Sequence, residues 1–269
     1  MEVTLLLAAG GGAAGLFGSL LGLGGGILIV PMLTLGFGLD VRHAVGISLL
    51  GVVATSSASA AVYLQRHVAR LRLGSLLELG TVGGAIAGGL IAFALDGRLI
   101  AGLFAAMLLY TALSMLWRRS DGGDGGEDGS AEVLPETWPR HLGGGVVAGV
   151  VGGIVSALLG VGGGVVLVPA MHLLMGLPMR AATATSNLMI GVTVTASAFL
   201  YVSRGAVDAF VAGPTVLGVV VGATLGSRVS HRIDLRVLRL LFVVVLCIVA
   251  AQMAARALDL HGIPLLTRG

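Results

Sequence analysis

Charged side chains are scarce in this chain of 269 residues, at 11% against roughly 25% in soluble globular domains. So few charges cannot cover the surface of a soluble protein of this length. Lysine is absent, which excludes a Walker A loop and a Schiff-base lysine. Cysteine occurs once, as Cys247 in an apolar run, so a disulfide framework, a cysteine-rich metal site and a CxxC redox pair are also excluded.

Apolar residues dominate what is present. They make up 56% of the chain, glycine adds 45 residues, and the mean hydropathy is +1.02. This composition predicts an integral membrane protein. The net charge of +3 arises from arginines. In a membrane protein, arginine in short loops sets the orientation, so the basic balance indicates no nucleic-acid partner.

The chain contains an internal repeat with an offset of 138 residues and no gap. The string GLGGG at 22–26 aligns with GVGGG at 160–164, and Pro31 aligns with Pro169. Because chance similarity between apolar stretches would match mainly Leu and Val, the pattern predicts two copies of one structural unit. The other matched pairs include Gly38 and Gly176, Arg42 and Arg180, Ser48 and Ser186, Thr55 and Thr193, Ser59 and Ser197, and Tyr63 and Tyr201.

Composition sets the boundaries of the two copies. Residues 1–117 and 141–269 are predicted to be the two transmembrane repeats, joined by 118–140. The joining segment is acidic, rich in glycine and without periodicity, which predicts a flexible linker. The apolar stretch 3–20 resembles the core of a signal peptide, but it recurs at 141–158, so we expect it to be retained structure.

Each repeat is predicted to contain three full spans, because a helix needs about 20 residues to cross a bilayer. Before each trio stand an apolar arm, a glycine-rich elbow and a second arm of eleven residues, 27–37 in the first repeat. That short arm reaches about 17 Å, roughly half the hydrocarbon thickness. The predicted fold is therefore all-α, with a broken, re-entrant helical hairpin and three transmembrane helices in each repeat. The six long stretches are 44–65, 76–95, 99–117, 181–201, 210–229 and 240–258.

The distribution of arginine predicts that the two repeats are inverted. The loop 66–72 carries three arginines and His67, whereas its counterpart in the second repeat carries only Arg204. The segment 228–239 carries four arginines, whereas its counterpart at 96–98 carries one. Under the positive-inside rule both basic loops are cytoplasmic. We therefore expect a bacterial-type inner-membrane protein with the linker inside and both termini outside.

Inverted repeats with interrupted helices are typical of secondary transporters, which bind substrate near the bilayer midplane. The segments GLGGGILIVPML and GVGGGVVLVPAM, each before a helix lined by Ser and Thr, resemble the sulfite exporter TauE/SafE family. That family is also described as the toluenesulfonate uptake permease family, and the resemblance covers both repeats. It implies a membrane transporter, not an enzyme, that moves sulfite, sulfonates or related organosulfur anions.

The glycine-rich elbows are predicted to bind the anion. At the start of each short arm, unpaired amides and the positive end of the helix dipole favour an oxyanion. Consecutive glycines let backbone N–H groups approach a ligand without an intervening Cβ. Close helix packing is the alternative explanation of such a string. The residues predicted to bind are Gly24, Gly25, Gly26, Gly162, Gly163 and Gly164.

Hydroxyl side chains on the next helix form a second layer of predicted contacts. Ser48, Thr55 and Ser59 are spaced by seven and four residues, so they share one helix face. The second repeat has the same stripe, and Asn187 adds an amide donor. Bonding of these hydroxyls to their own helix is the alternative. The residues predicted for this layer are Ser48, Thr55, Ser186, Asn187 and Thr193.

Ionisable residues are few within the predicted spans. His172 lies in the short arm of the second repeat and is expected near the membrane centre, where the first repeat has Thr34. Glu78 lies in the first turn of its expected helix, near the membrane edge. Both are candidates for proton coupling, because intramembrane ionisable residues usually serve function. No metal or cofactor is expected, and the enzyme motifs HExxH and GxSxG are absent from the sequence.

The sequence thus predicts a secondary transporter of small sulfur-containing oxyanions in a lipid bilayer, with a homodimer as one candidate state. Export is favoured, because an inside-negative potential drives anions outward. The alternatives are a proton- or sodium-coupled uptake permease and a cation-selective or channel-like protein. Cation paths usually carry acidic residues, and Glu78 is the only acid inside a predicted span.

Overall fold

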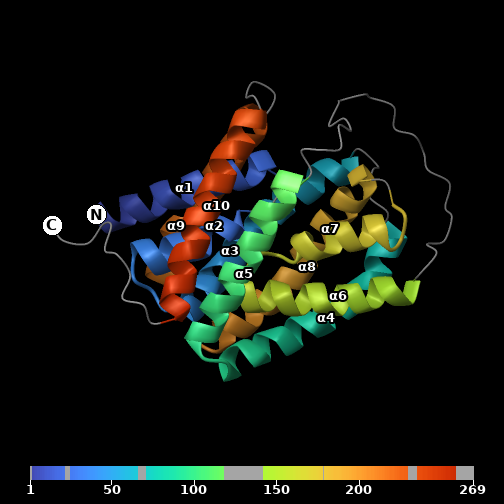
Figure 1. The fold of residues 1–269 in the computed structure, drawn as a ribbon, viewed down its shortest axis with the longest axis horizontal. Coiled ribbons are helices and arrows are strands. Elements are labelled where there is room, and N and C mark those ends of the chain that lie inside the picture. The colour runs from blue at the N-terminus through green and yellow to red at the C-terminus, as the bar shows by residue number, and fades with distance from the viewer. Residues whose placement is uncertain are drawn as a thin grey trace.

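The computed structural model describes residues 2–21, 25–65, 71–117, 142–177, 179–229 and 235–258 (Figure 1). Helices account for nearly all of these residues, and none of them belongs to a strand. The predicted all-α fold class is therefore confirmed. The predicted linker, 118–140, lies outside the described residues.

The elements follow the same order in the two halves of the chain. The first half contains α1 (Glu2–Leu21), α2 (Gly26–Pro31), the π-helical η1 (Met32–Gly36), α3 (Val41–Gln65), α4 (Leu71–Ala94) and α5 (Gly97–Trp117). The second half contains α6 (Leu142–Leu159), α7 (Gly164–Leu173), α8 (Met179–Ser203), α9 (Ala209–Val229) and α10 (Leu235–Ala257).

All six predicted long stretches form helices, of 21 to 25 residues each. Five described helices are long and apolar enough to cross a membrane, namely α1, α4, α5, α8 and α9. The described apolar windows of α3 and α10, Val41–Ser57 and Phe242–Ala257, are shorter. Two boundaries differ clearly from the prediction, because α4 begins at Leu71 rather than at residue 76 and α10 begins at Leu235 rather than at residue 240.

Each half opens with a long helical arm followed by a short one, as predicted. The 20-residue α1 precedes the short apolar arm Gly26–Gly36, and the 18-residue α6 precedes the 10-residue α7. Gly25 and Gly163, directly before the short arms, have φ values of 75° and 71°. Gly38 and Gly176, after the short arms, have φ values of 69° and 70°. Since a Cβ disfavours positive φ, these turns explain why glycine recurs at matched positions.

The long arm of each hairpin packs on a helix from the other half. α1 lies against α9, and α6 lies against α4. Gly222 of α9 faces the Gly12 carbonyl of α1, and Gly84 of α4 faces the Val150 carbonyl of α6. A Cβ at either glycine would overlap the neighbouring backbone, as in small-residue contacts between membrane helices. The two hairpins are therefore exchanged between the halves.

Two long helices of the first half pack on their counterparts in the second half. The first of them, α3, packs against α8, and the third, α5, packs against α10. α3 and α8 run in opposite directions, because Gly46 lies beside Tyr201 while Ser56 lies beside Gly191. Near the middle of the two helices, the equivalent residues Val52 and Ile190 lie beside the same glycine, Gly162.

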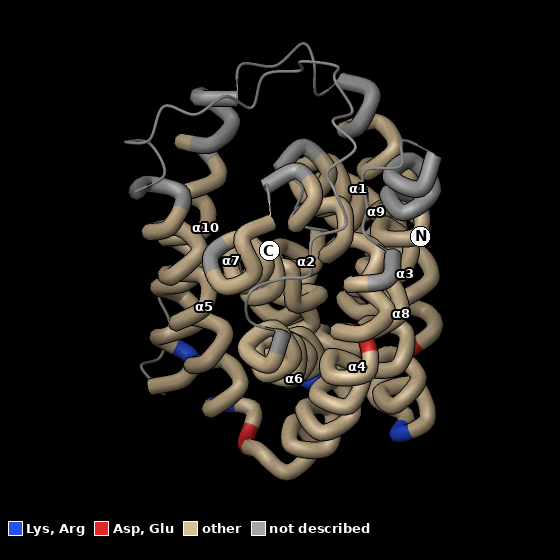
Figure 2. Tube along the Cα trace, turned by 90° about the vertical axis from the view of Figure 1, so that its right-hand side faces the viewer, with Lys and Arg blue, Asp and Glu red and all other residues tan. Residues whose placement is uncertain are grey.

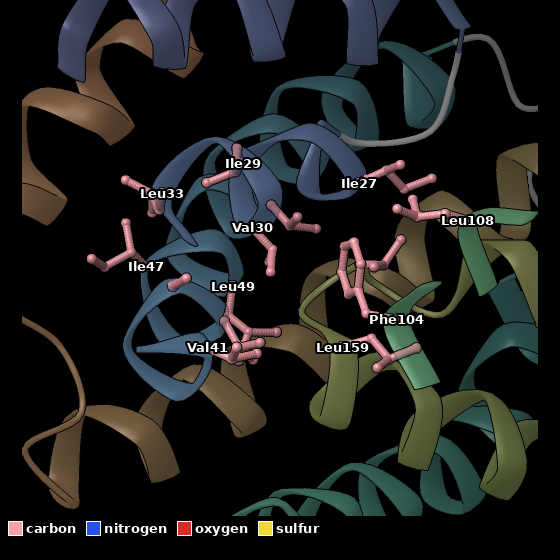
Figure 3. Close-up of a cluster of buried hydrophobic side chains, with 14 of the residues drawn as sticks. Ile27, Ile29, Val30, Leu33, Val41, Ile47, Leu49, Phe104, Leu108 and Leu159 are labelled. Carbon is pink, nitrogen blue, oxygen red and sulfur yellow. The ribbon is translucent and has the colours of Figure 1, made fainter. Parts of the chain in front are cut away.

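Apolar side chains enclose the first short arm (Figure 3). Ile27 and Val30 of α2 are grouped with Phe104 and Leu108 of α5 and with Leu159 of α6, and all five are buried. Because lipid tails are as apolar as these side chains, close packing rather than removal from water stabilises the group. The arm is thus surrounded by protein, the condition under which a broken helix is tolerated at membrane depth.

With one exception, the charged residues of the described helices lie near helix ends (Figure 2). Arg42 and Arg98 are the second residues of α3 and α5, and Arg204 directly follows α8. The guanidinium of Arg42 donates to the Leu95 carbonyl, which anchors α3 to the end of α4. The exception is Glu78, which among the acidic residues of the described helices is the only one deeper than the first turn.

Candidate functional site

The two elbows are the glycine-rich turns before α2 (the first elbow) and before α7 (the second elbow), and they meet beside the middle of α3. Gly26, at the start of α2, lies against the carbonyl of Gly160 in the other elbow. Val52, in the middle of the 25-residue α3, lies beside both Gly26 and Gly162. Ser48, one turn earlier, donates a hydrogen bond of 2.7 Å to the Gly160 carbonyl and lies 3.3 Å from the Gly26 carbonyl. The two elbows therefore contact each other beside the middle of α3.

The second elbow combines a helix N-terminus with two buried hydroxyls. The first α7 amides that donate to the preceding turn are those of Val166 and Leu167, each 3.0 Å from the Gly163 carbonyl. Ser156 of α6 and Ser186 of α8 flank this turn, and at most 1% of either residue is exposed. Neither hydroxyl has a hydrogen-bond partner within the described part of the chain. Unused donors beside the positive end of a ten-residue helix favour an anion.

The first elbow lacks this arrangement. Ser48 is the repeat counterpart of Ser186, but its hydroxyl is already bonded to Gly160. The counterpart of Ser156 is Gly18, which has no side chain. Among the described residues, the unpartnered hydroxyls therefore belong to the second elbow alone.

A second polar cluster joins α4 to α8. The hydroxyl oxygen of Thr193 lies 2.8 Å from Glu78 Oε1 and 3.0 Å from the hydroxyl oxygen of Thr81. Thr81 donates to the backbone carbonyl of Glu78 at 3.0 Å. Thr193 is flanked on α8 by Ile190 and Val194, whose side chains face the second elbow. The cluster therefore lies at the depth of that elbow.

Most of the predicted elbow glycines are closely packed. A Cβ added at Gly163 or Gly164 would approach a neighbouring atom to 2.8 or 2.9 Å, and one at Gly25 would approach to 3.4 Å. Close packing thus accounts for part of the glycine pattern, and contact of these residues with a ligand stays a prediction. Gly24 lies outside the described residues.

The remaining residues of the predicted hydroxyl layer have mixed surroundings. Thr55 is buried and donates to the Val52 carbonyl of its own helix at 3.1 Å. Asn187 is half-buried on α8, directly after Ser186. The side chain of Ser59 lies outside the described part. Bonding within the helix, the alternative to ligand binding, therefore applies to Thr55.

The two proton-coupling candidates, His172 and Glu78, lie in different surroundings. His172 lies in the last turn of α7, is exposed, and places its Nδ1 2.7 Å from the Leu177 carbonyl. The opposite end of α7 lies at the elbow, and the expected depth of His172 in the membrane stays a prediction. Glu78 is half-buried about two turns into α4, which begins at Leu71, so its expected place in the first turn is wrong.

Three polar residues near the elbow were not predicted. Ser156 borders the second elbow, Thr81 contacts Thr193, and Tyr201 donates to the Ala157 carbonyl of α6 at 3.0 Å. The counterpart of Ser156 is glycine and that of Thr81 is Val219, so neither residue belongs to a matched pair of the two repeats. Their one sequence signal is a hydroxyl within an otherwise apolar helix.

A cavity of about 370 Å³ lies between α1, the α2–η1 arm and α10. Its lining is apolar apart from Gln252 and includes none of the predicted site residues. Within the described ranges, no group of three His, Cys, Asp or Glu side chains is placed to hold a metal. The polar chemistry of the described molecule is instead gathered around the second elbow.

Apolar helices, exchanged hairpins and broken helices that meet beside the middle of α3 define the architecture of a multi-pass membrane transporter. The family described as sulfite exporter TauE/SafE matches residues 7–253. The match covers nearly the whole chain, and the protein belongs to this family.

Three curated relatives are each named a probable membrane transporter protein. YunE of Bacillus subtilis is 26% identical over 261 residues, which cover 89% of this chain and 93% of the relative. The relative from Xylella fastidiosa is 27% identical, with 82% and 83% of the two chains covered. The relative from Methanocaldococcus jannaschii is 25% identical, with 88% and 90% covered. No solved structure gives a significant match.

Proposed function

We propose that the protein is a secondary transporter of small sulfur-containing oxyanions, and that the anion binds at the second elbow. The observation that carries the proposal is the pair of buried, unpartnered hydroxyls of Ser156 and Ser186 beside the N-terminus of α7. The description of the family as sulfite exporters supports the substrate class.

The chemistry of this elbow suits an oxyanion. Next to backbone amides and the positive end of α7, the two serine hydroxyls act as donors, and an oxyanion supplies only acceptors. α6 and α7 contain no arginine or lysine, so the anion is held by dipoles and hydrogen bonds rather than by an ion pair. Binding of this strength allows release on the far side, which transport requires.

The arrangement of the helices supports alternating access. The antiparallel α3–α8 crossing and the exchanged hairpins are what two inverted repeats around one central site require. The arginine-rich segments 66–72 and 228–239 support a cytoplasmic position for both loops and for the linker 118–140, with both termini outside. The membrane potential favours export of the bound anion.

Flux measurements with the full chain in proteoliposomes test the proposal. Sulfite, sulfate, thiosulfate, taurine and sulfoacetate are offered separately, and we expect saturable flux of at least one of them. In Ser156→Ala and Ser186→Ala, the KM for that substrate should rise about 10- to 150-fold, because a hydrogen bond to a charged group contributes about 1.5–3 kcal/mol.

Thr195→Ala is the matched control for the serine variants. Thr195 lies on α8, is exposed, and donates to the Gly191 carbonyl of its own helix at 2.6 Å. Its variant should keep the wild-type KM. Absence of flux for all five compounds would contradict the transport function. An unchanged KM in both folded serine variants would contradict the location of the site.

A further inference from the structure

Two short oxygen–oxygen contacts link α8 to α4, and a third within α4 completes a closed ring. Thr193 Oγ1 lies 2.8 Å from Glu78 Oε1 and 3.0 Å from Thr81 Oγ1. Thr81 Oγ1 lies 3.0 Å from the backbone carbonyl of Glu78. Each of these contacts needs one hydrogen between its two oxygens.

The number of available hydrogens favours a protonated carboxyl group. The two threonine hydroxyls supply one hydrogen each, and the backbone carbonyl supplies none. The single hydrogen of Thr193 can go to Glu78 Oε1 or to Thr81, but not to both at once. All three contacts carry a hydrogen when Thr81 donates to the carbonyl of Glu78, Thr193 donates to Thr81, and a protonated carboxyl group of Glu78 donates to Thr193.

Among the side chains that the structure describes, none forms an ion pair with the carboxyl group of Glu78. α6, which packs on α4, contains no ionisable residue. On α8, Arg180 is thirteen residues from Thr193, about 20 Å along the axis, and Tyr201 is bonded to α6. Arg72 precedes Glu78 on α4 by six residues, about 9 Å along the axis. His172 of α7 is exposed and faces the Leu177 carbonyl.

We propose that Glu78 is a resident proton-binding site, and that the anion passes only while its carboxyl group is neutral. This inference rests on the proposed anion transport. Thr193, whose hydroxyl contacts the carboxyl group of Glu78, lies between two residues that face the second elbow. An ionised carboxylate at this depth would repel the anion at that elbow. Deprotonation would also leave one oxygen contact of the ring without a hydrogen, which loosens α4 from α8.

Infrared spectroscopy of the full chain in liposomes tests the proton directly, without substrate. At neutral pH the wild type should show the C=O band of a neutral carboxyl group, and this band should be lost in Glu78→Gln. The band should remain in Glu2→Gln, which removes an acid from the first turn of α1. In Thr193→Ala the band should move to higher wavenumber, because the carboxyl group loses its hydrogen-bond acceptor. Identical carboxyl bands in the wild type and Glu78→Gln would overturn the assignment.

Flux of whichever of the five compounds is transported, measured at equal pH on both sides, tests the requirement for a neutral carboxyl group. Glutamine is neutral at every pH and can donate the same bond to Thr193. The ratio of wild-type flux to Glu78→Gln flux cancels the titration of the transported compound itself. We expect this ratio to be constant at acidic pH and to fall about tenfold for each pH unit above the titration of Glu78.

The outcomes separate this inference from the proposed function. A flux ratio that is constant at all pH values, or a folded Glu78→Gln protein that does not transport the compound carried by the wild type at acidic pH, would overturn the resident-proton inference. Absence of flux for all five compounds in the wild type would contradict the anion function, while the infrared result would still decide the state of Glu78.

Discussion

The hydroxyl of Ser48 donates a hydrogen bond of 2.7 Å to the carbonyl of Gly160, so a helix of the first half fixes the elbow of the second. The counterpart of Ser48 is Ser186, which is equally buried but has no partner within the described residues. Duplication thus placed the same serine twice, and only one copy is used to hold the fold. The other is left available to a ligand.

Replacing Ser48 should loosen the contact between the elbows. Ser48→Ala leaves the buried Gly160 carbonyl without its donor, which costs about 1–3 kcal/mol. We expect a lower unfolding temperature in detergent and slower transport. Ser57→Ala is the control, since Ser57 lies on the same helix, is exposed, and bonds to the Val53 carbonyl of that helix. Equal stability of the two variants would show that the bond does not hold the elbow.

Two adjacent glycines of α4 should respond oppositely to alanine. At Gly84 a Cβ would overlap the Val150 carbonyl of α6, so Gly84→Ala should destabilise the protein by about 1–3 kcal/mol, as overpacking does. At Gly83 nothing lies within 4 Å, so Gly83→Ala should be neutral or stabilise the helix by up to about 1 kcal/mol. Thermal unfolding in detergent measures both. The same loss in the two variants would contradict the close α4–α6 packing.

Sequence reasoning found the architecture because the architecture is duplicated. Positive φ at Gly25 and Gly163 demands glycine twice, and an apolar length near 20 residues identifies each long helix. Residues that differ between the two repeats give no such signal. Ser156 and Thr81 have Gly18 and Val219 as counterparts, so matching discards the side chains that make the two elbows different.

The boundary of α4 explains why the predicted place of Glu78 in the first turn was wrong. An apolar window begins only after the polar residues near 72–75, yet the helix itself continues back to Leu71, because end residues can reach the interface. Glu78 therefore lies deeper than the window suggests. For His172, the length of the short arm does not indicate which of its ends meets the other elbow, and contacts between α3 and the elbow show that it is the end opposite to His172.

The two basic segments should lie on the same, cytoplasmic side of the membrane. Arg70→Cys and Arg232→Cys are made separately in a Cys247→Ser background, because Cys247 is a free, exposed thiol. Under the positive-inside rule, an impermeant thiol reagent added outside intact cells should label neither variant, and both should react once the inner face is open. Labelling of one position from outside and of the other from inside would mean that the repeats are not inverted.

The last prediction concerns the driving force. An inside-negative potential favours the exit of each negative charge by about 2.3 kcal/mol per 100 mV, so a bound monoanion or dianion can leave without a coupling ion. We expect flux in proteoliposomes to follow a potential imposed with potassium and valinomycin, in the absence of any pH or sodium gradient. Reversing the potential should reverse the net flux, and a dianion should respond about twice as strongly as a monoanion. Flux that ignores the potential, follows a proton gradient and disappears in Glu78→Gln or His172→Ala would instead establish proton-coupled uptake.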